Sequence, residues 1–136
     1  MASERTSFLS DASRFGIGWR VWFWLLPGIN LLAPLFFLGQ PESWITLTAS
    51  LLAAVIIVSL HCRLGWVRLL GIGHFPWIGF VPWLVFRYVT TSTEGIFGIW
   101  MLAVILIDST SLAIDFVDVF RYVAGDRSPL VSPGNR

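Results

Sequence analysis

Four long apolar runs, separated by short polar segments, dominate this sequence. As a helix with a rise of about 1.5 Å per residue, each run approaches the roughly 30 Å of a bilayer's hydrocarbon core. Only 12% of the residues are charged and 56% are hydrophobic, whereas a soluble domain carries about a quarter charged residues. The sequence therefore predicts an all-α integral membrane protein with a bundle of four transmembrane helices. The predicted spans cover about 19–38, 44–61, 70–86 and 95–117.

Polar segments flank this predicted bundle. Residues 1–18 are expected to form a polar N-terminal segment, either a loose tail or a short interfacial helix. The four-helix domain is expected to occupy 19–120, and a polar cytoplasmic tail 121–136. The chain does not open with an apolar stretch and a small-residue cleavage site, so we expect no removed signal peptide.

Proline and glycine interrupt two of the runs. Pro27 and Pro34 lie inside the first, and Pro76 and Pro82 lie with several glycines inside the third. A proline within a helix removes a backbone donor and kinks the helix. The first and third spans are therefore expected to be kinked, and Asn30 is expected to bond a neighbouring helix or a carbonyl that a proline leaves free.

All nine basic residues are arginine. The absence of lysine excludes a Schiff-base site, and with it retinal or pyridoxal chemistry, and it excludes a phosphate-binding loop lysine. Arginines gather in the N-terminal segment, in the connector after the second run and in the tail, while the first loop has none. The positive-inside rule then predicts that both termini are cytoplasmic. We interpret the compact chain as a multi-pass protein of a bacterial inner membrane.

Three carboxylates stand in the last apolar run, at Asp108, Asp115 and Asp118. An Asp near the centre of a membrane helix costs about 2.5 to 3.5 kcal/mol, so partners, water or a proton must offset it. At 100° per residue the three carboxylates lie on one face of a helix. Toward the N-terminal end of the same run, the residues on this face are apolar. This face is expected to point into the bundle.

The predicted orientation brings further polar residues to the cytoplasmic half of the bundle. Asp118 is interpreted as a residue of the membrane edge that pairs with Arg121; in a structural role, Asp115 and Asp118 pair with Arg63, Arg68, Arg121 or Arg20. The predicted functional polar cluster consists of Asp108, Asp115, His61, His74, Arg63, Arg68 and Asn30. We expect it to line a polar vestibule on the inner side.

Two functions fit this pattern best. In the first, the chain is a structural or accessory subunit of a larger membrane complex, and the polar cluster fixes the register of the helices. In the alternative, the chain is a small oligomeric proton- or cation-coupled transporter or channel that uses Asp108 with His61 and His74. Lipid, and either other membrane subunits or further copies of the chain, are the expected partners.

Other functions find less support. His61 and His74 offer two axial ligands for haem or a pigment if they meet across the vestibule, but we predict no cofactor. A membrane enzyme that acts on a lipid is a further alternative, in which Asp115 and Asp118 share one divalent cation. No His-x-x-x-His, Glu-x-x-His or Gly-x-Ser-x-Gly spacing occurs, so we predict no metal site and do not expect an enzyme. A net charge of +1 gives no reason to expect nucleic acid. The eight tryptophans are expected at the membrane interfaces and around the kinks.

Overall fold

The computed structural model describes residues 15–91 and 93–128, and every regular element in these two ranges is helical. In chain order the elements are α2 (Ile17–Pro27), the π-helix η1 (Gly28–Leu32), the 3₁₀-helix η2 (Ala33–Phe37), α3 (Pro41–Leu64), the 3₁₀-helix η3 (Arg68–His74), α4 (Pro76–Thr90) and α5 (Gly95–Val123). The predicted N-terminal segment before residue 15 and the tail after residue 128 lie outside the described residues.

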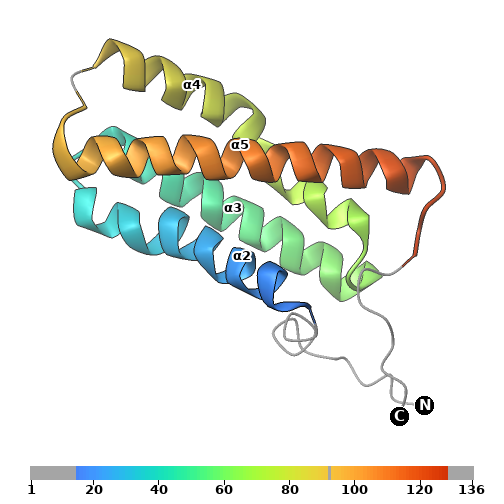
Figure 1. Cartoon of the computed structure of the whole chain (residues 1–136). Helices are drawn as coiled ribbons and strands as arrows, with labels where there is room; N and C mark the ends of the chain where they lie inside the picture. Colours follow the sequence, from blue (N-terminus) through green and yellow to red (C-terminus); the bar gives the residue numbers. More distant parts are fainter. Residues whose placement is uncertain (1–14, 92, 129–136) are drawn as a thin grey trace.

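The helices lie side by side along one direction, and α5 runs the length of the bundle (Figure 1). By length and apolarity three helices are able to cross a membrane: the run Ile17–Phe37, α3 and α5. A fourth span is obtained if η3 and α4, which are bent by 46° relative to each other, are counted as one. The architecture is therefore an all-helical bundle compatible with a multi-pass membrane protein.

Both expected irregular regions depart from a regular α-helix. The first run changes from α to π after Pro27 and then to 3₁₀, and Pro34 is the second residue of that last turn. The third run bends at Phe75, immediately before Pro76. The last helix continues to Val123, so Arg121 belongs to its final turn. With 29 residues, α5 is about 43 Å long and exceeds the hydrocarbon core of a bilayer.

The interior contains both aromatic and small residues. A buried hydrophobic cluster joins α3, α4 and α5, and its members are Ala49, Trp77, Phe80, Val81, Leu84, Trp100, Met101 and Val104. Large apolar side chains such as Leu51, Val55 and Phe116 are exposed on the outside of the bundle. This distribution suits a lipid environment, where helices contact one another through small and polar residues.

The short helix η3 packs closely against two others. A Cβ added at Gly71 would lie 2.9 Å from Asp115 Cβ, and one added at Gly73 would collide with Ile57 of α3. Since Gly71 and Gly73 have no side chain, the backbone of η3 approaches both α3 and α5. This approach carries Arg68 and His74 to the acidic face of α5.

Candidate functional site

The centre of the bundle holds one polar pair. Asn30 of η1 donates a hydrogen bond from Nδ2 to Asp108 Oδ1 of α5, over 2.9 Å. Both residues are buried, and Asp108 is 3% exposed. The remaining oxygens, Asn30 Oδ1 and Asp108 Oδ2, are buried and accept no hydrogen bond from the described residues. Of the seven residues in the predicted cluster, Asn30 is thus the one hydrogen-bonded to Asp108.

Pro34 explains why η1 attracts polar side chains. Because Pro34 has no N–H, it gives no hydrogen bond to Asn30 O, four residues back, or to Ile29 O, five residues back. Two side chains of other helices approach these carbonyls instead. Trp100 Nε1 donates to Ile29 O at 3.0 Å, and Ser50 Oγ shares its one proton between Thr46 O of its own helix at 2.7 Å and Asn30 O at 3.3 Å. The π-helix is thereby tied to α3 and α5 at the depth of Asp108.

Two turns along α5 from Asp108, a second pair joins α5 to η3. His74 Nδ1 lies 2.7 Å from Asp115 Oδ2, and both side chains are partly buried. A ring N–H facing a carboxylate is a charge-assisted hydrogen bond, among the stronger kinds in proteins. The structure therefore brings these two members of the predicted cluster together. Ser111, which is buried, lies between Asp108 and Asp115 on the same face of α5.

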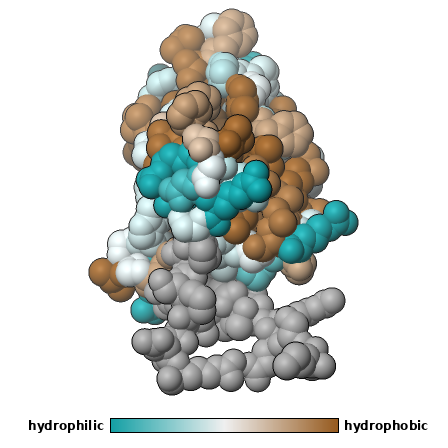
Figure 2. Space-filling view, turned by 90° about the vertical axis from the view of Figure 1, so that its right-hand side faces the viewer, coloured by the Kyte–Doolittle hydropathy of each residue, from teal (hydrophilic) through white to brown (hydrophobic). Residues whose placement is uncertain are grey.

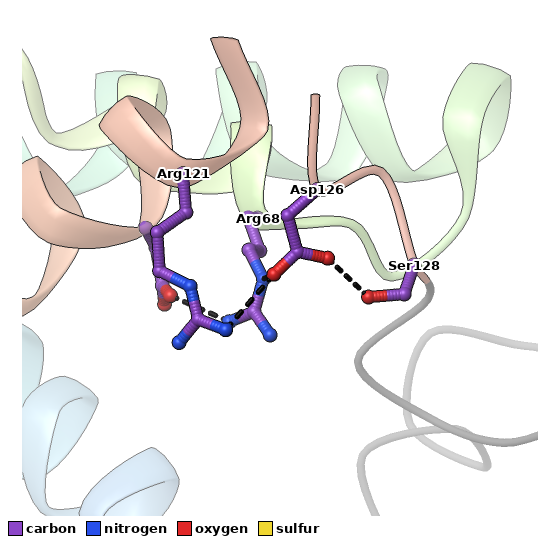
Figure 3. A network of polar contacts seen from close by, with 5 residues as sticks. Arg68, Arg121, Asp126 and Ser128 are labelled. Atoms are coloured by element: carbon purple, nitrogen blue, oxygen red, sulfur yellow. Dashed lines mark hydrogen bonds and ion pairs between the residues drawn. The ribbon is translucent and has the colours of Figure 1, made fainter. Parts of the chain in front are cut away.

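A network of charged side chains closes the end of the bundle at which α5 ends, which we call the α5 C-terminal end. Arg68 Nη1 donates to Asp118 Oδ1 at 2.8 Å, and Arg68 Nε lies 3.3 Å from Asp126 Oδ2. Arg121 Nη2 lies 2.9 Å from the same Asp126 oxygen, and Ser128 Oγ donates to Asp126 Oδ1 (Figure 3). Asp126 follows α5, and the Ser128 hydrogen bond lowers its pKa from the ordinary value.

Seen from this end, the bundle shows a hydrophilic patch flanked by hydrophobic surface (Figure 2). The interpretation of Asp118 as a partner of Arg121 is wrong, because Asp118 contacts Arg68 and Arg121 contacts Asp126. Sequence separation misled that interpretation: Arg121 is three residues from Asp118, but η3 presents Arg68 from another element.

His61 and Arg63, near the end of α3, do not belong to these pairs. His61 is buried, and its ring packs edge-to-face on Trp66 at 5.4 Å between centroids. Arg63 is exposed. The two histidines thus have different surroundings, Trp66 for His61 and Asp115 for His74. Among the described residues, no three His, Cys, Asp or Glu side chains gather as metal ligands.

The opposite end of the bundle, which we call the α5 N-terminal end, contains an ion pair that sequence reasoning missed. Glu42, in the first turn of α3, is 1% exposed, and its Oε1 accepts a hydrogen bond from Arg87 Nε of α4 at 2.7 Å. The second span is predicted to begin at about residue 44, which leaves Glu42 in the segment before it, whereas α3 begins at Pro41. Neighbouring Ser43 is also fully buried.

A stripe of polar residues on α3 is the sequence signal from which the burial of Glu42 could have been predicted. Glu42, Thr46 and Ser50 are four residues apart and therefore lie on one face of the helix. Thr46 and Ser50 bond their own helix, donating to Glu42 O and Thr46 O, but both are buried. An interior stripe of acid, hydroxyl and alanine, with leucine and valine outside, marks the face that packs against other helices.

Together these residues form a line of polar side chains through the bundle. From Glu42 to Ser50 the line follows α3 for about 12 Å, and from Asp108 to Asp118 it follows α5 for about 15 Å. Two hydrogen bonds at Asn30 connect the α3 stretch to the α5 stretch. Ser50 Oγ bonds Asn30 O, and the side chain of Asn30 donates to Asp108. The two stretches together approach the roughly 30 Å of a hydrocarbon core.

No family model, no curated protein and no solved structure matches this chain. The function must therefore be inferred from the residues and their contacts.

Proposed function

We propose that this chain is a multi-pass inner-membrane protein that acts as a structural or accessory subunit of a larger membrane complex. One observation carries the proposal: each carboxyl group inside the bundle contacts a side chain from a different element. The four contacts are Glu42 with Arg87, Asp108 with Asn30, Asp115 with His74 and Asp118 with Arg68. Such contacts fix the register of the helices and leave the exterior apolar.

The distribution of charge supports cytoplasmic termini. Arg68 and Arg121 lie at the α5 C-terminal end, whereas Glu42 pairs with Arg87 at the opposite end. An excess of arginine marks the cytoplasmic side of a membrane protein. In this orientation the bend between η3 and α4 belongs to one span, which makes four spans in all.

The exterior supports a partner that is itself a membrane protein. Large aromatic side chains such as Trp24 and Phe116 are exposed on the bundle. Lipid covers such residues, and so does the surface of a neighbouring subunit; aromatic anchors are frequent in protein interfaces. The carboxyl groups in the interior, in contrast, each contact a side chain of the same chain.

Copurification from native membranes tests this proposal. Tagged wild-type chain should bring down a stoichiometric larger partner, and Asp108→Asn should bring down the same amount, because Asp108 faces the interior. Phe116→Ala and Trp24→Ala test the exterior, and Thr110→Ala on exposed α5 surface is their control. Isolation of the wild-type chain as a clean homo-oligomer, with no stoichiometric partner, would contradict the accessory role.

A proton- or cation-coupled transporter is the second candidate function. The polar line from Glu42 through Ser50, Asn30 and Asp108 to Asp118 favours it, because polar groups are present in both halves of the bundle. Intramembrane carboxylates and histidines are the usual materials of ion pathways. Purified protein in liposomes should then carry a proton or cation flux that Asp108→Asn abolishes. The absence of any Asp108-dependent flux would reject this candidate.

A further inference from the structure

The Asn30–Asp108 pair differs from the other carboxyl contacts in the nature of its partner. Glu42 and Asp118 each contact an arginine, and Asp115 contacts a histidine. Asp108 is hydrogen-bonded to a neutral amide. A buried charge in an apolar medium is far more costly than a buried neutral group unless a counter-charge accompanies it. An amide donor is too weak to be such a counter-charge.

The unused hydrogen-bonding atoms of this pair indicate what is missing. Asn30 Oδ1 and Asp108 Oδ2 are both buried oxygens without a donor among the described residues. A carboxylic acid has one O–H donor in addition to its acceptor, and an amide has both a donor and an acceptor. One proton on Asp108 Oδ2 therefore turns this atom into a donor and allows the amide and the acid to bond through both of their polar atoms.

A route for that proton leads toward the α5 C-terminal end. Ser111 is one turn from Asp108 and is buried, and Asp115 follows one turn later, in contact with His74. His74 and Asp115 are only partly buried. On the other side, Ser50 of α3 donates to Asn30 O, and the nearest ionisable groups along α3 and α4 are Glu42 and Arg87, at the opposite end.

We propose that the Asn30–Asp108 pair is a proton-binding site, with one proton held on Asp108 Oδ2, and that His74 and Asp115 exchange this proton with the α5 C-terminal end. The proton leaves water for the His74–Asp115 pair and then passes by Ser111 to Asp108, and it returns by the same path. This inference does not rest on the accessory role, because it concerns the interior of the chain alone.

Infrared spectroscopy of the purified full chain in lipid vesicles tests the site directly. At neutral pH the wild type should show a carboxylic-acid C=O band that shifts in D₂O. Asp108→Asn should lose one carboxyl group per chain from this band, while Thr110→Ala, an exposed change two residues away, should retain it. A missing acid band in the wild type, or a full-strength band in a folded Asp108→Asn variant, would overturn the proposal.

Two further measurements separate a proton from other occupants and test the route. Adding Na⁺ at constant pH should leave the band unchanged, and its removal by Na⁺ would assign the site to a metal cation instead. His74→Gln should keep the intensity of the band but slow its shift after transfer to D₂O. An unchanged rate in His74→Gln would overturn the assigned route. The wild-type band and its Na⁺ response need no variant, so the test stands even if Asp108→Asn does not fold.

Discussion

The bundle buries carboxyl groups in two different ways. At the α5 N-terminal end, Glu42 is buried against the guanidinium of Arg87, whereas at the centre Asp108 is buried against the amide of Asn30. The first arrangement balances a charge with a charge. The second supplies one neutral donor and no counter-charge. Both sites leave a carboxyl oxygen without a donor among the described residues, Glu42 Oε2 in the first and Asp108 Oδ2 in the second. Two carboxyl groups that are equally buried can therefore have different roles. An arginine partner favours the charged carboxylate, whereas an amide partner favours the protonated, neutral acid.

The largest effect is expected at the charged pair. Arg87→Ala leaves Glu42 buried without its counter-charge, and breaking a buried pair in this way costs about 3 to 5 kcal/mol. Reversible unfolding in mixed detergent micelles measures the change. The double variant Arg87→Ala with Glu42→Gln should recover part of the loss, because no uncompensated charge remains. Equal losses in the single and double variants would contradict the ion-pair account.

Removing the partner at the centre should cost less. Asn30→Ala takes one hydrogen bond from Asp108, and a buried polar group left without its partner costs about 1 to 3 kcal/mol. The same unfolding assay allows direct comparison with Arg87→Ala. If Asn30→Ala proved the more damaging of the two, the contrast between the two pairs would fail.

The close packing of η3 gives a third prediction. Gly73→Ala should destabilise the bundle by about 1 to 3 kcal/mol, because the added methyl collides with Ile57. Gly79→Ala is the matched control: Gly79 lies on the exposed face of α4 with nothing within 4 Å of an added Cβ. Alanine there should stabilise the helix slightly, by about 0.5 to 1 kcal/mol. Equal effects of the two changes would contradict the described approach of η3 to α3.

The exposed ion pair at the α5 C-terminal end should matter little. Arg121 is exposed and contacts Asp126, and water and salt weaken an ion pair between exposed side chains. Arg121→Ala should therefore change stability far less than Arg87→Ala does, and the change should shrink as salt is added. A loss as large as that of Arg87→Ala, persisting in high salt, would show that this end is as buried as the other.

The smallest effect concerns Asp126 alone. Its pKa is lowered chiefly by the hydrogen bond from Ser128, so Ser128→Ala should raise that pKa toward the ordinary value of Asp. Because the folded pKa lies below the unfolded one, the contribution of Asp126 to stability is present at neutral pH and is lost as pH falls through the lowered pKa. NMR titration of the Asp126 carboxyl measures the shift, and an unchanged pKa would remove Ser128 as its cause.

The sequence predicted the helical class and the inward face of α5 because both follow from helix periodicity and apolar length. On α5, Met101 and Val104 lie on the face that also carries Asp108 and Ser111, and all four residues are buried, as helix periodicity predicts for an inward face. Prolines likewise marked the places where the first and third runs become irregular. Whether the protein occupies an inner membrane, with which orientation and beside which partner, stays a prediction.

The partners of the polar residues could not be predicted, because each depends on how separate helices are placed. Asp108 was expected among histidines, arginines and Asn30, and of these Asn30 is the one that hydrogen-bonds it, since η1 and α5 meet at that depth. Glu42 falls between the first two predicted spans because it follows Gly39, Gln40 and Pro41, although proline is frequent in the first turn of a helix. Glu42, Thr46 and Ser50 share one face of a helix that begins at Pro41, and this pattern predicts that the three side chains are buried together.

The π-helix η1 has a consequence for the order in which the protein is built. The carbonyls of Ile29 and Asn30 obtain donors from Trp100 and Ser50, which the ribosome synthesises after the first helix. A newly inserted first helix thus lacks the donors that these carbonyls have in the folded bundle, and unsatisfied carbonyls are costly in lipid. For the proposed membrane protein we therefore expect the first helix to enter lipid together with the last one rather than by itself.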